Sequence, residues 1–292
     1  MAYYRPVEDN PSPPDTVYVA AGGKSLKLPS LDFDGEFDVV VIGGGYVGCS
    51  AALYISEAGL KVAVLEGNEV GWGSASRNAG QVSAHASKLE PEAVLKTYGK
   101  KYGERLNEVG AKAPEFVLGL AKKYEFDVSA VKGGIVTAAH STDALDRLRK
   151  RSEYWQNHGA PVDILDAAET SNVLGSEMYV GSCIDRRGIA INPLAFIRGI
   201  AQAAISNGAF IFEHTKVDTF SRDNNKWQIK AAAHTITADQ ILLCTNAYTD
   251  DIWPRLKRTI IPVRGYQIWT KPLRGNDRGK ILKGISCALE TR

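Results

Sequence analysis

The stretch Phe-Asp-Val-Val-Val-Ile-Gly-Gly-Gly-Tyr-Val-Gly, residues 37–48, decides the fold of this chain. Its first half holds an apolar run at residues 39–42, which is typical of a buried parallel strand. The run leads into Gly43, Gly45 and Gly48, which have the G-x-G-x-x-G spacing of a dinucleotide-binding turn. In such a turn the first glycine allows the sharp bend, the second admits a pyrophosphate, and the third lets the helix approach the strand.

The residues after the glycine turn complete a strand–turn–helix–strand unit. A helix is expected over residues 46–58, with its N-terminal amides directed at a phosphate and Gly59 just past its end. A second strand is expected over residues 61–66. Its last residue, Glu66, follows the turn at close to the spacing of an acid that binds ribose hydroxyls. Since a carboxylate would repel the 2′-phosphate of NADP, NAD and FAD remain as candidates.

A second glycine-rich segment follows, Gly-Trp-Gly-Ser-Ala-Ser-Arg-Asn-Ala-Gly-Gln at residues 71–81. Its small residues offer backbone amides at close range, and Arg77, Asn78 and Gln81 add polar side chains. Such a loop suits a ligand that extends beyond the first phosphates, which favours FAD over NAD. The alternative is an ordinary Gly/Ser surface turn.

Composition limits the function classes that need to be considered. The chain has 292 residues, a net charge of +2 and 23% charged residues, so no basic patch indicates a nucleic-acid partner. The four cysteines are widely scattered and form no Cys/His cluster, which disfavours a metal site and a disulfide framework. The sequence shows neither a secretory signal nor an apolar run of about 18 residues, so we expect no membrane association and a cytoplasmic location.

Periodicity gives a coarse map of the remaining elements. Helices are expected over residues 91–124, 145–158 and 195–206, the last with Asn192 as its N-cap. Strands are expected over residues 209–213, 226–231 and 236–243. Asp223-Asn-Asn225 is expected to form a hairpin turn between the first two of these strands. A partly irregular arm precedes the first strand.

The two glycine-rich motifs together resemble those of the D-amino-acid-oxidase-like family of FAD-dependent oxidoreductases, and look most like its gamma-glutamylputrescine oxidase branch. Further resemblances follow in the order of the chain, at residues 132–139, 191–204, 207–213 with Val217, 241–247 and 262–265. The resemblance covers nearly everything from Phe37 onward.

The resemblance implies an α/β fold, with a Rossmann-like FAD-binding domain of the glutathione-reductase type and an interleaved, truncated α+β substrate domain. The domain boundaries that it implies are an N-terminal arm at 1–36, an FAD-binding domain at 37–90 and 191–258, and a substrate domain at 91–190 and 259–292. The chain ends at residues 287–292, where family members continue with more substrate-domain strands and a glycine-rich segment. We therefore expect weak FAD retention and little or no turnover.

The expected cofactor-binding residues come from the turn, the acid and the resemblance. They are Gly43, Gly45, Tyr46, Val47 and Gly48 for the pyrophosphate; Glu66 for the adenosine ribose; Ser74, Arg77, Asn78, Gly80 and Gln81 for the span toward the flavin ring; Val217 for the adenine side; and Thr245, Asn246 and Ala247 for backbone contacts. Some family members bind flavin covalently through a histidine at positions that correspond to 73–77. Because this chain has no histidine there, non-covalent FAD is expected.

The resemblance also implies the chemistry. A C–N bond of a small amine or amino acid would be oxidised by hydride transfer to the flavin, the imine would hydrolyse, and dioxygen or another acceptor would take the electrons. No residue is assigned a catalytic role; His85 could face the ring or be structural, and Arg264 and Tyr266 could line the substrate sheet or only pack. Two alternatives stay open, a non-catalytic remnant that keeps the dinucleotide-binding fold and an NAD-dependent dehydrogenase. The substrate and the oligomeric state stay open too.

Overall fold

The computed structural model describes residues 15–292 apart from 23, 87, 88, 262 and 264. The described chain divides into two compact units. The first unit comprises the described residues of Met1–Ala79, Phe126–Val128 and Asn192–Ile268. The second comprises those of Gly80–Glu125, Ser129–Ile191 and Trp269–Arg292. Each unit is built from segments that are distant in sequence.

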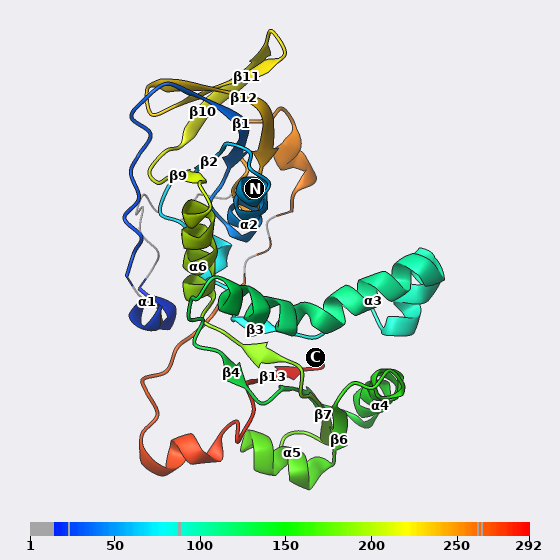
Figure 1. Cartoon of the computed structure of the whole chain (residues 1–292). Coiled ribbons are helices and arrows are strands. Elements are labelled where there is room, and N and C mark those ends of the chain that lie inside the picture. The colour runs from blue at the N-terminus through cyan, green and yellow to red at the C-terminus, as the bar shows by residue number, and fades with distance from the viewer. Residues whose placement is uncertain (1–14, 23, 87–88, 262, 264) are drawn as a thin grey trace. The chain divides into compact units, whose positions relative to one another are not determined.

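The first unit is built on a six-stranded sheet in the order β10-β11-β12-β1-β2-β9 (Figure 1). Its strands are β1 Gly35–Ile42, β2 Val62–Leu65, β9 Phe210–Phe212, β10 Val217–Asp223, β11 Lys226–Ala231 and β12 His234–Leu243. Strands β12, β1, β2 and β9 are parallel, whereas β10, β11 and β12 form an antiparallel meander. The apolar runs expected to be buried strands are the centre of this sheet, because residues 39–42 and 62–65 are all buried.

Two helices of the first unit pack against each other, α2 Tyr46–Glu57 and α6 Pro193–Ser206. Helix α2 begins at the residue that the sequence indicated, and Gly59 has the positive φ of +80° expected after its end. Helix α6 begins two residues earlier than expected. Asn192 caps it, since its Oδ1 accepts hydrogen bonds from the amides of Leu194 and Ala195 at 3.0 and 3.1 Å.

The prediction of a hairpin between residues 209–213 and 226–231 is wrong. Strand β9 pairs in parallel with β2, and the turn at Asn224 and Asn225 joins β10 to β11 instead. Strand β10 was missed because its sequence, Val-Asp-Thr-Phe-Ser-Arg-Asp, is mostly polar and exposed, so apolar alternation does not mark it.

The N-terminal segment was expected to be a partly irregular arm. It contains a short helix, α1 Val17–Ala21, and then a stretch without regular secondary structure that leads into β1. The Leu31 side chain, only 2% exposed, belongs to the same apolar core as Phe37 and Ile236. The segment from residue 28 onward is therefore part of the first unit.

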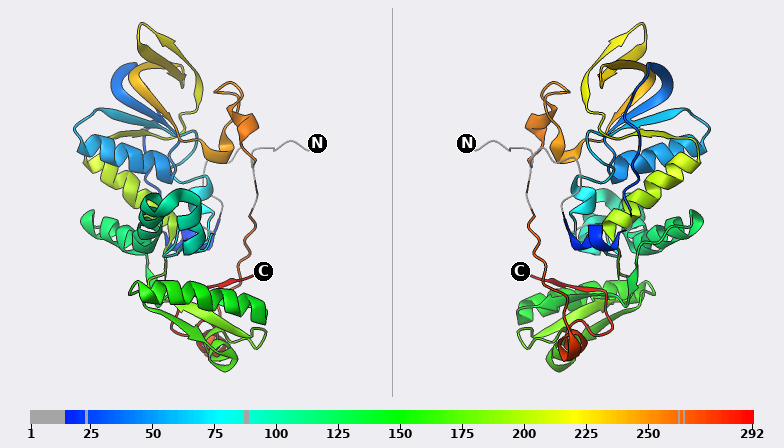
Figure 2. Two further views of the ribbon diagram at one scale, coloured as in Figure 1. Left: turned by 90° about the vertical axis from the view of Figure 1, so that its right-hand side faces the viewer. Right: turned by 90° about the vertical axis from the view of Figure 1, so that its left-hand side faces the viewer.

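The second unit contains a four-stranded sheet in the order β13-β5-β7-β6 and a three-stranded antiparallel sheet in the order β3-β8-β4. Its strands are β3 Gln81–Val82, β4 Val131–Lys132, β5 Ile135–Ala139, β6 Val162–Leu165, β7 Gly181–Asp185, β8 Ile189–Ala190 and β13 Cys287–Glu290. Helix α4, Thr142–Asn157, lies along the four-stranded sheet (Figure 2) and buries Leu145, Leu148 and Trp155 against it. It begins at Thr142 because the Ser141 side chain caps its first turn.

Two further helices complete the second unit. Helix α3, Pro91–Lys123, was expected as one helix, but Gly99 has φ +74° and divides it in two. Helix α5, Ala167–Leu174, was missed, although Asp166 and Glu169 form a capping box that was visible in the sequence.

The chain passes between the two units at residues 79/80, 125/126, 128/129, 191/192 and 268/269, and the expected domain boundaries stay predictions. Residues 80–90 fall in the second unit rather than with the glycine turn, and Phe126–Val128 and residues 259–268 fall in the first. The fold class is α/β with a Rossmann-like first unit, as the sequence indicated. The second unit mixes helices with largely antiparallel sheets.

The turn between β11 and β12 allows a test of this fold. Ala232 and Ala233 have φ of +49° and +66°, so two alanines occupy the two central positions of a type I′ hairpin turn, where Asn-Gly is favoured. An L-residue with a side chain is strained there by about 1–2 kcal/mol. We expect replacement of the pair by Asn-Gly to raise the free energy of unfolding by about 1 kcal/mol, measured in urea. The matched control is Ala231→Gly, at the adjacent buried strand position, which should lower the free energy of unfolding. An Asn-Gly variant that is less stable than the unaltered chain would contradict the type I′ turn at residues 232 and 233.

Candidate cofactor site

The three glycines of the turn, Gly43, Gly45 and Gly48, differ in what a Cβ atom at each position would meet. Gly43 has φ +111°, and a Cβ atom there would lie 2.7 Å from the carbonyl oxygen of Cys244. A Cβ atom on Gly48 would lie 1.9 Å from the carbonyl oxygen of Gly43. At Gly45, by contrast, a Cβ atom would meet nothing within 4 Å. The first and third glycines therefore allow backbone contacts inside the protein, and the second leaves open space beside the turn.

That open space lies at the N-terminus of helix α2. Gly45 is the N-cap and provides no side-chain hydrogen bond to the first-turn amides. The side chain of Val47 in this first turn is 71% exposed. Because first-turn amides and the helix dipole favour an anion, the turn fits a pyrophosphate.

Glu66 lies directly behind the turn. Its Oε2 accepts a hydrogen bond from the Gly44 amide at 2.7 Å, and its Oε1 accepts one from the Asn68 amide at 2.9 Å. Burial raises the pKa of this carboxyl, while the bonds from the two amides act in the opposite direction. Since each carboxylate oxygen can accept more than one hydrogen bond, Glu66 can hold the turn and still accept from a ribose hydroxyl.

Other expected cofactor residues of the first unit meet at the same edge of its sheet. The Gly43 turn lies against Cys244 and Thr245, which follow strand β12. Residues Asn246–Tyr248 form a short 3-10 helix, and Asn246 has φ +48°. The Tyr248 ring meets the Trp72 ring edge to face at 5.5 Å. The structure thus brings together the turn at residues 43–48, Glu66, the loop at 72–78 and residues 245–247. This is the carboxyl edge of a parallel sheet, where open α/β folds bind ligands.

The loop at residues 72–78 uses its polar side chains to hold its own shape. Arg77 Nε donates to the Trp72 carbonyl oxygen at 2.9 Å, and the guanidinium group lies 4.7 Å from the centre of the Trp72 ring. Asn78 Nδ2 donates to the carbonyl oxygens of Ser74 and Ala75 at 3.1 and 3.0 Å. These contacts do not test the cofactor contacts expected of Ser74, Arg77 and Asn78, which stay predictions.

The remaining expected residues have different surroundings. Val217 is buried and opens β10, directly after Lys216, whose Cβ lies 3.7 Å from the position that a Cβ atom on Gly67 would take. Gly80 and Gln81 belong to the second unit, where Gln81 pairs with Ala190 of β8.

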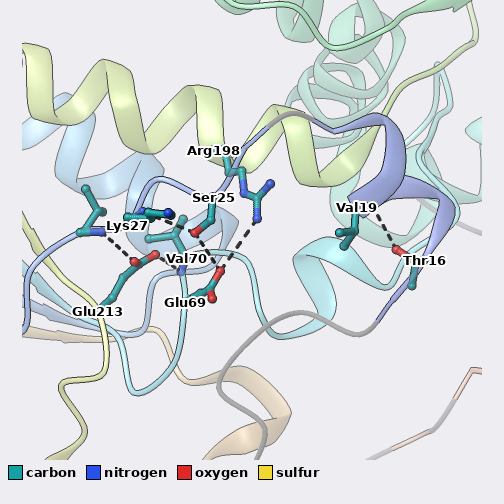
Figure 3. Close-up of polar contacts among 9 residues, drawn as sticks. Thr16, Val19, Ser25, Lys27, Glu69, Val70, Arg198 and Glu213 are labelled. Atoms are coloured by element: carbon teal, nitrogen blue, oxygen red, sulfur yellow. Dashed lines mark hydrogen bonds and ion pairs between the residues drawn. The ribbon is translucent and has the colours of Figure 1, made fainter.

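The sequence did not single out Glu213, which the structure places in a polar cluster (Figure 3). Its carboxylate is 1% exposed. Its Oε2 accepts from the Leu28 amide at 2.9 Å and its Oε1 from the Val70 amide at 2.8 Å. Glu213 thus joins the N-terminal segment to the loop that follows Glu66. The sequence did contain a signal for this role of Glu213, because a charged residue stands directly after an apolar strand.

A second charged group in this cluster was also missed. The Arg198 guanidinium of α6, which is buried, lies 4.0 Å from Glu69 Oε2, and Ser25 Oγ donates to the same oxygen at 3.0 Å (Figure 3). Burial lowers the pKa of Arg198, although an arginine keeps its charge at any physiological pH. The contacts of Glu69 with Arg198 and Ser25 hold the loop that follows Glu66 against α6 and the N-terminal segment.

Several other candidate residues lie elsewhere. His85 lines a cavity of about 40 Å³ in the second unit together with Arg151 and Cys183, which is room for two or three waters at about 10–15 Å³ each. Arg264 and Pro262 lie outside the described residues, and Tyr266 is exposed. All four cysteines are free, and Cys244 is half-buried.

The described residues form neither a metal-binding cluster nor a membrane-spanning helix. They contain no group of three His, Cys, Asp or Glu side chains that could hold a metal ion. The helices in this part of the chain all fall short of the length and apolar character that a membrane-spanning helix requires.

The turn, the helix behind it and the acid at the end of the second strand define a protein of the dinucleotide-binding class. A family model narrows this class, since it matches residues 38–287 and is described as DAO, FAD dependent oxidoreductase. The chain belongs to this family of FAD-dependent oxidoreductases.

Curated relatives agree with the family. The chain is 30% identical over 258 residues to gamma-glutamylputrescine oxidoreductase of Escherichia coli (strain K12), a match that covers 88% of this chain and 60% of the relative. It is 28% identical over 244 residues to glycine oxidase of Bacillus licheniformis, which covers 79% of this chain and 60% of that relative. The chain therefore spans about 60% of the length of these relatives.

Solved structures share the fold. Glycine oxidase from Geobacillus kaustophilus has a TM-score of 0.60 at 22% identity, over 73% of this chain and 56% of that one. L-proline dehydrogenase from P. horikoshii has a TM-score of 0.59 at 20% identity, over 74% of this chain and 54% of that one. At these identities the likeness establishes the fold alone.

The steric difference between the glycines gives a test of the site. Gly45→Ala should leave the free energy of unfolding within about 1 kcal/mol, because φ at this position is −86° and the space is open. It should nevertheless weaken FAD binding, because the new methyl group occupies the space expected for the pyrophosphate. Gly48→Ala should destabilise the protein itself, by about 3 kcal/mol or more, because its Cβ would overlap a backbone carbonyl.

The measurements are urea unfolding without nucleotide and titration with FAD. Equal FAD affinity in Gly45→Ala and in the unaltered chain would contradict the placement of the pyrophosphate.

Glu66 gives a prediction about pH. Because burial raises its pKa in the folded protein, the folded state binds this proton more tightly than the unfolded chain does. The stability of the unaltered chain relative to Glu66→Gln should therefore fall as the pH rises through the raised pKa. Urea unfolding of both proteins across the acid-to-neutral range checks this, with Asp218→Asn as a control at an exposed carboxylate. A difference that grows with pH would show that the amide hydrogen bonds outweigh burial.

Proposed function

We propose that this chain binds FAD non-covalently and functions in an oxidoreductase that oxidises a C–N bond of a small amine or amino acid. Family membership supports FAD as the cofactor. The names of the relatives support the substrate class, because gamma-glutamylputrescine and glycine both carry an amino nitrogen. A gamma-glutamylputrescine-like amine is the substrate that we would test first. Dioxygen or another acceptor would reoxidise the protein, and a cytoplasmic location fits these substrates.

The observation that carries the proposal is the open space at Gly45, at a helix N-terminus without a side-chain cap, together with Glu66, which accepts from the amide of the adjacent Gly44. This arrangement fits a pyrophosphate followed by a ribose. We assign the pyrophosphate to residues 43–48, the adenosine ribose to Glu66, the adenine side to Val217, and backbone contacts to residues 245–247.

The loop from Ser74 to Gln81 is assigned to the flavin side. Its positions 73–77 contain no histidine, which supports a non-covalent cofactor. Bound FAD would supply the redox chemistry by accepting a hydride from the substrate carbon. The residues of this chain would hold the cofactor and orient it. We also propose residues 37–90 and 191–258 as the FAD-binding domain, with 91–190 and 259–292 contributing to substrate binding.

The second candidate function is cofactor binding without catalysis, by a chain that keeps the dinucleotide-binding fold. The activities named for the relatives belong to longer proteins, and this chain spans about 60% of their length. The comparison therefore supports cofactor binding by these residues more directly than it supports catalysis.

The test is the visible absorption spectrum of the purified chain with and without added FAD, followed by acid precipitation. We expect a flavin spectrum whose cofactor is released by acid. Flavin that stays with the precipitate would contradict non-covalent binding, and a chain that takes up no FAD would contradict the cofactor assignment.

Substrate class is tested by anaerobic reduction of the bound flavin. Gamma-glutamylputrescine, putrescine, glycine and D-amino acids are the compounds to add, with lactate as the control that lacks nitrogen. Because little turnover is expected of this chain, the expected result is slow bleaching by an amine and none by lactate. Retained flavin that no amine reduces would favour the non-catalytic candidate.

A further inference from the structure

The Tyr46 side chain lies where three segments of the first unit meet. Its hydroxyl oxygen is 3.1 Å from the carbonyl oxygen of Ala75 and 3.0 Å from that of Pro193, and Asn78 Nδ2 lies 3.4 Å from it. Its ring packs against the Phe196 ring with centroids 5.7 Å apart. One side chain therefore joins the first turn of α2, the loop at residues 72–78 and the start of α6.

The hydroxyl keeps the same hydrogen-bonding role at any pH at which the protein would be handled. Burial raises the pKa of Tyr46 to about 12, so the phenol stays neutral and keeps its proton. With one proton, it donates to either carbonyl oxygen, and its oxygen accepts from Asn78. Phenylalanine would preserve the packing against Phe196 and remove all three contacts.

The other contacts of the loop anchor different parts of it. Its entry is fixed to the glycine turn by the Gly71 amide, which donates to the Gly44 carbonyl oxygen at 3.2 Å. Within the loop, the Asn78 and Arg77 side chains donate hydrogen bonds to the carbonyl oxygens of Trp72, Ser74 and Ala75. The Tyr46 hydroxyl thus ties the middle of the loop, at Ala75, to helix α2 and to the start of α6.

We infer that the Tyr46 hydroxyl is a positioning group that couples the pyrophosphate turn to the flavin-side loop at residues 72–78. This inference rests on the proposed function, which assigns the loop to the flavin half of FAD. The glycine turn is held by its own backbone contacts and by Glu66, neither of which involves the Tyr46 hydroxyl. Loss of the hydroxyl should therefore weaken binding of the flavin half and leave binding of the adenosine diphosphate half unchanged.

The experiment compares FAD and ADP as probes of the full 292-residue chain. Tyr46→Phe is the test variant. Tyr54→Phe is the matched control, because Tyr54 lies on the same helix and is 48% exposed. A typical hydrogen bond corresponds to a change of about 3- to 10-fold in a dissociation constant. We expect Tyr46→Phe to weaken FAD binding by that factor and to leave ADP binding within about twofold, with Tyr54→Phe unchanged for both.

Each other outcome overturns the inference. Unchanged FAD affinity would show that the hydroxyl does not position the loop. An equal loss for FAD and ADP would show a general effect on the fold.

A second readout needs no nucleotide. The amides of Ser76 and Arg77 are hydrogen-bonded within the loop, to Gly73 and Ser74. Their hydrogen exchange should be faster in Tyr46→Phe than in Tyr54→Phe, and equal rates would overturn the coupling. If the unaltered chain binds neither FAD nor ADP, the proposed function fails, whereas the exchange measurement still decides whether Tyr46 ties the loop.

Discussion

The close approach of the Gly43 carbonyl oxygen to Gly48 is the constraint on which the first unit depends. It brings the start of α2 directly onto the end of β1, so the helix can cover the sheet and leave its N-terminal amides at the sheet edge. Glu66 can then reach the Gly44 amide, and the loops after β2 and β12 can close around the same edge. A side chain at either of these two glycines would separate the helix from the strand and remove the geometry on which the candidate site is built.

Much of this unit could be predicted because its signals are local. Residues 39–42 form a buried strand, the glycine spacing marks the turn, and Asn192 caps α6; each pattern reflects a rule within a few residues. The misses have equally physical reasons. Strand β10 is polar because it is exposed, and the turn at Ala232 and Ala233 adopts positive φ without the residues that favour it. In both cases pairing with neighbouring strands outweighs local preference.

The candidate site shows the same division. The sequence identified the residues that line the turn, since their spacing follows from the ligand they would bind. It did not identify the role of Glu213 or of the Tyr46 hydroxyl, because both depend on partners that are distant in sequence. Arg77 and Asn78 were expected to contact a cofactor, and the structure provides them with contacts to the backbone of their own loop and, for Asn78, to the Tyr46 hydroxyl. A polar side chain in a ligand-binding loop thus has a structural role to fulfil before any binding role, and sequence alone does not separate the two.

The hydrogen bond between Leu28 and Glu213 has a consequence for the order in which the chain folds. Its partners are 185 residues apart, and the central strand β1 completes its parallel pairing with β12 only when residues 236–243 are available. During synthesis one edge of β1 therefore stays unpaired while the whole of the intervening second-unit segments emerges. Contacts of such high sequence separation form slowly, and an open strand edge invites wrong pairing. The same interleaving that assembles the candidate site from distant segments therefore leaves this strand edge open in the nascent chain until residue 243 has been made.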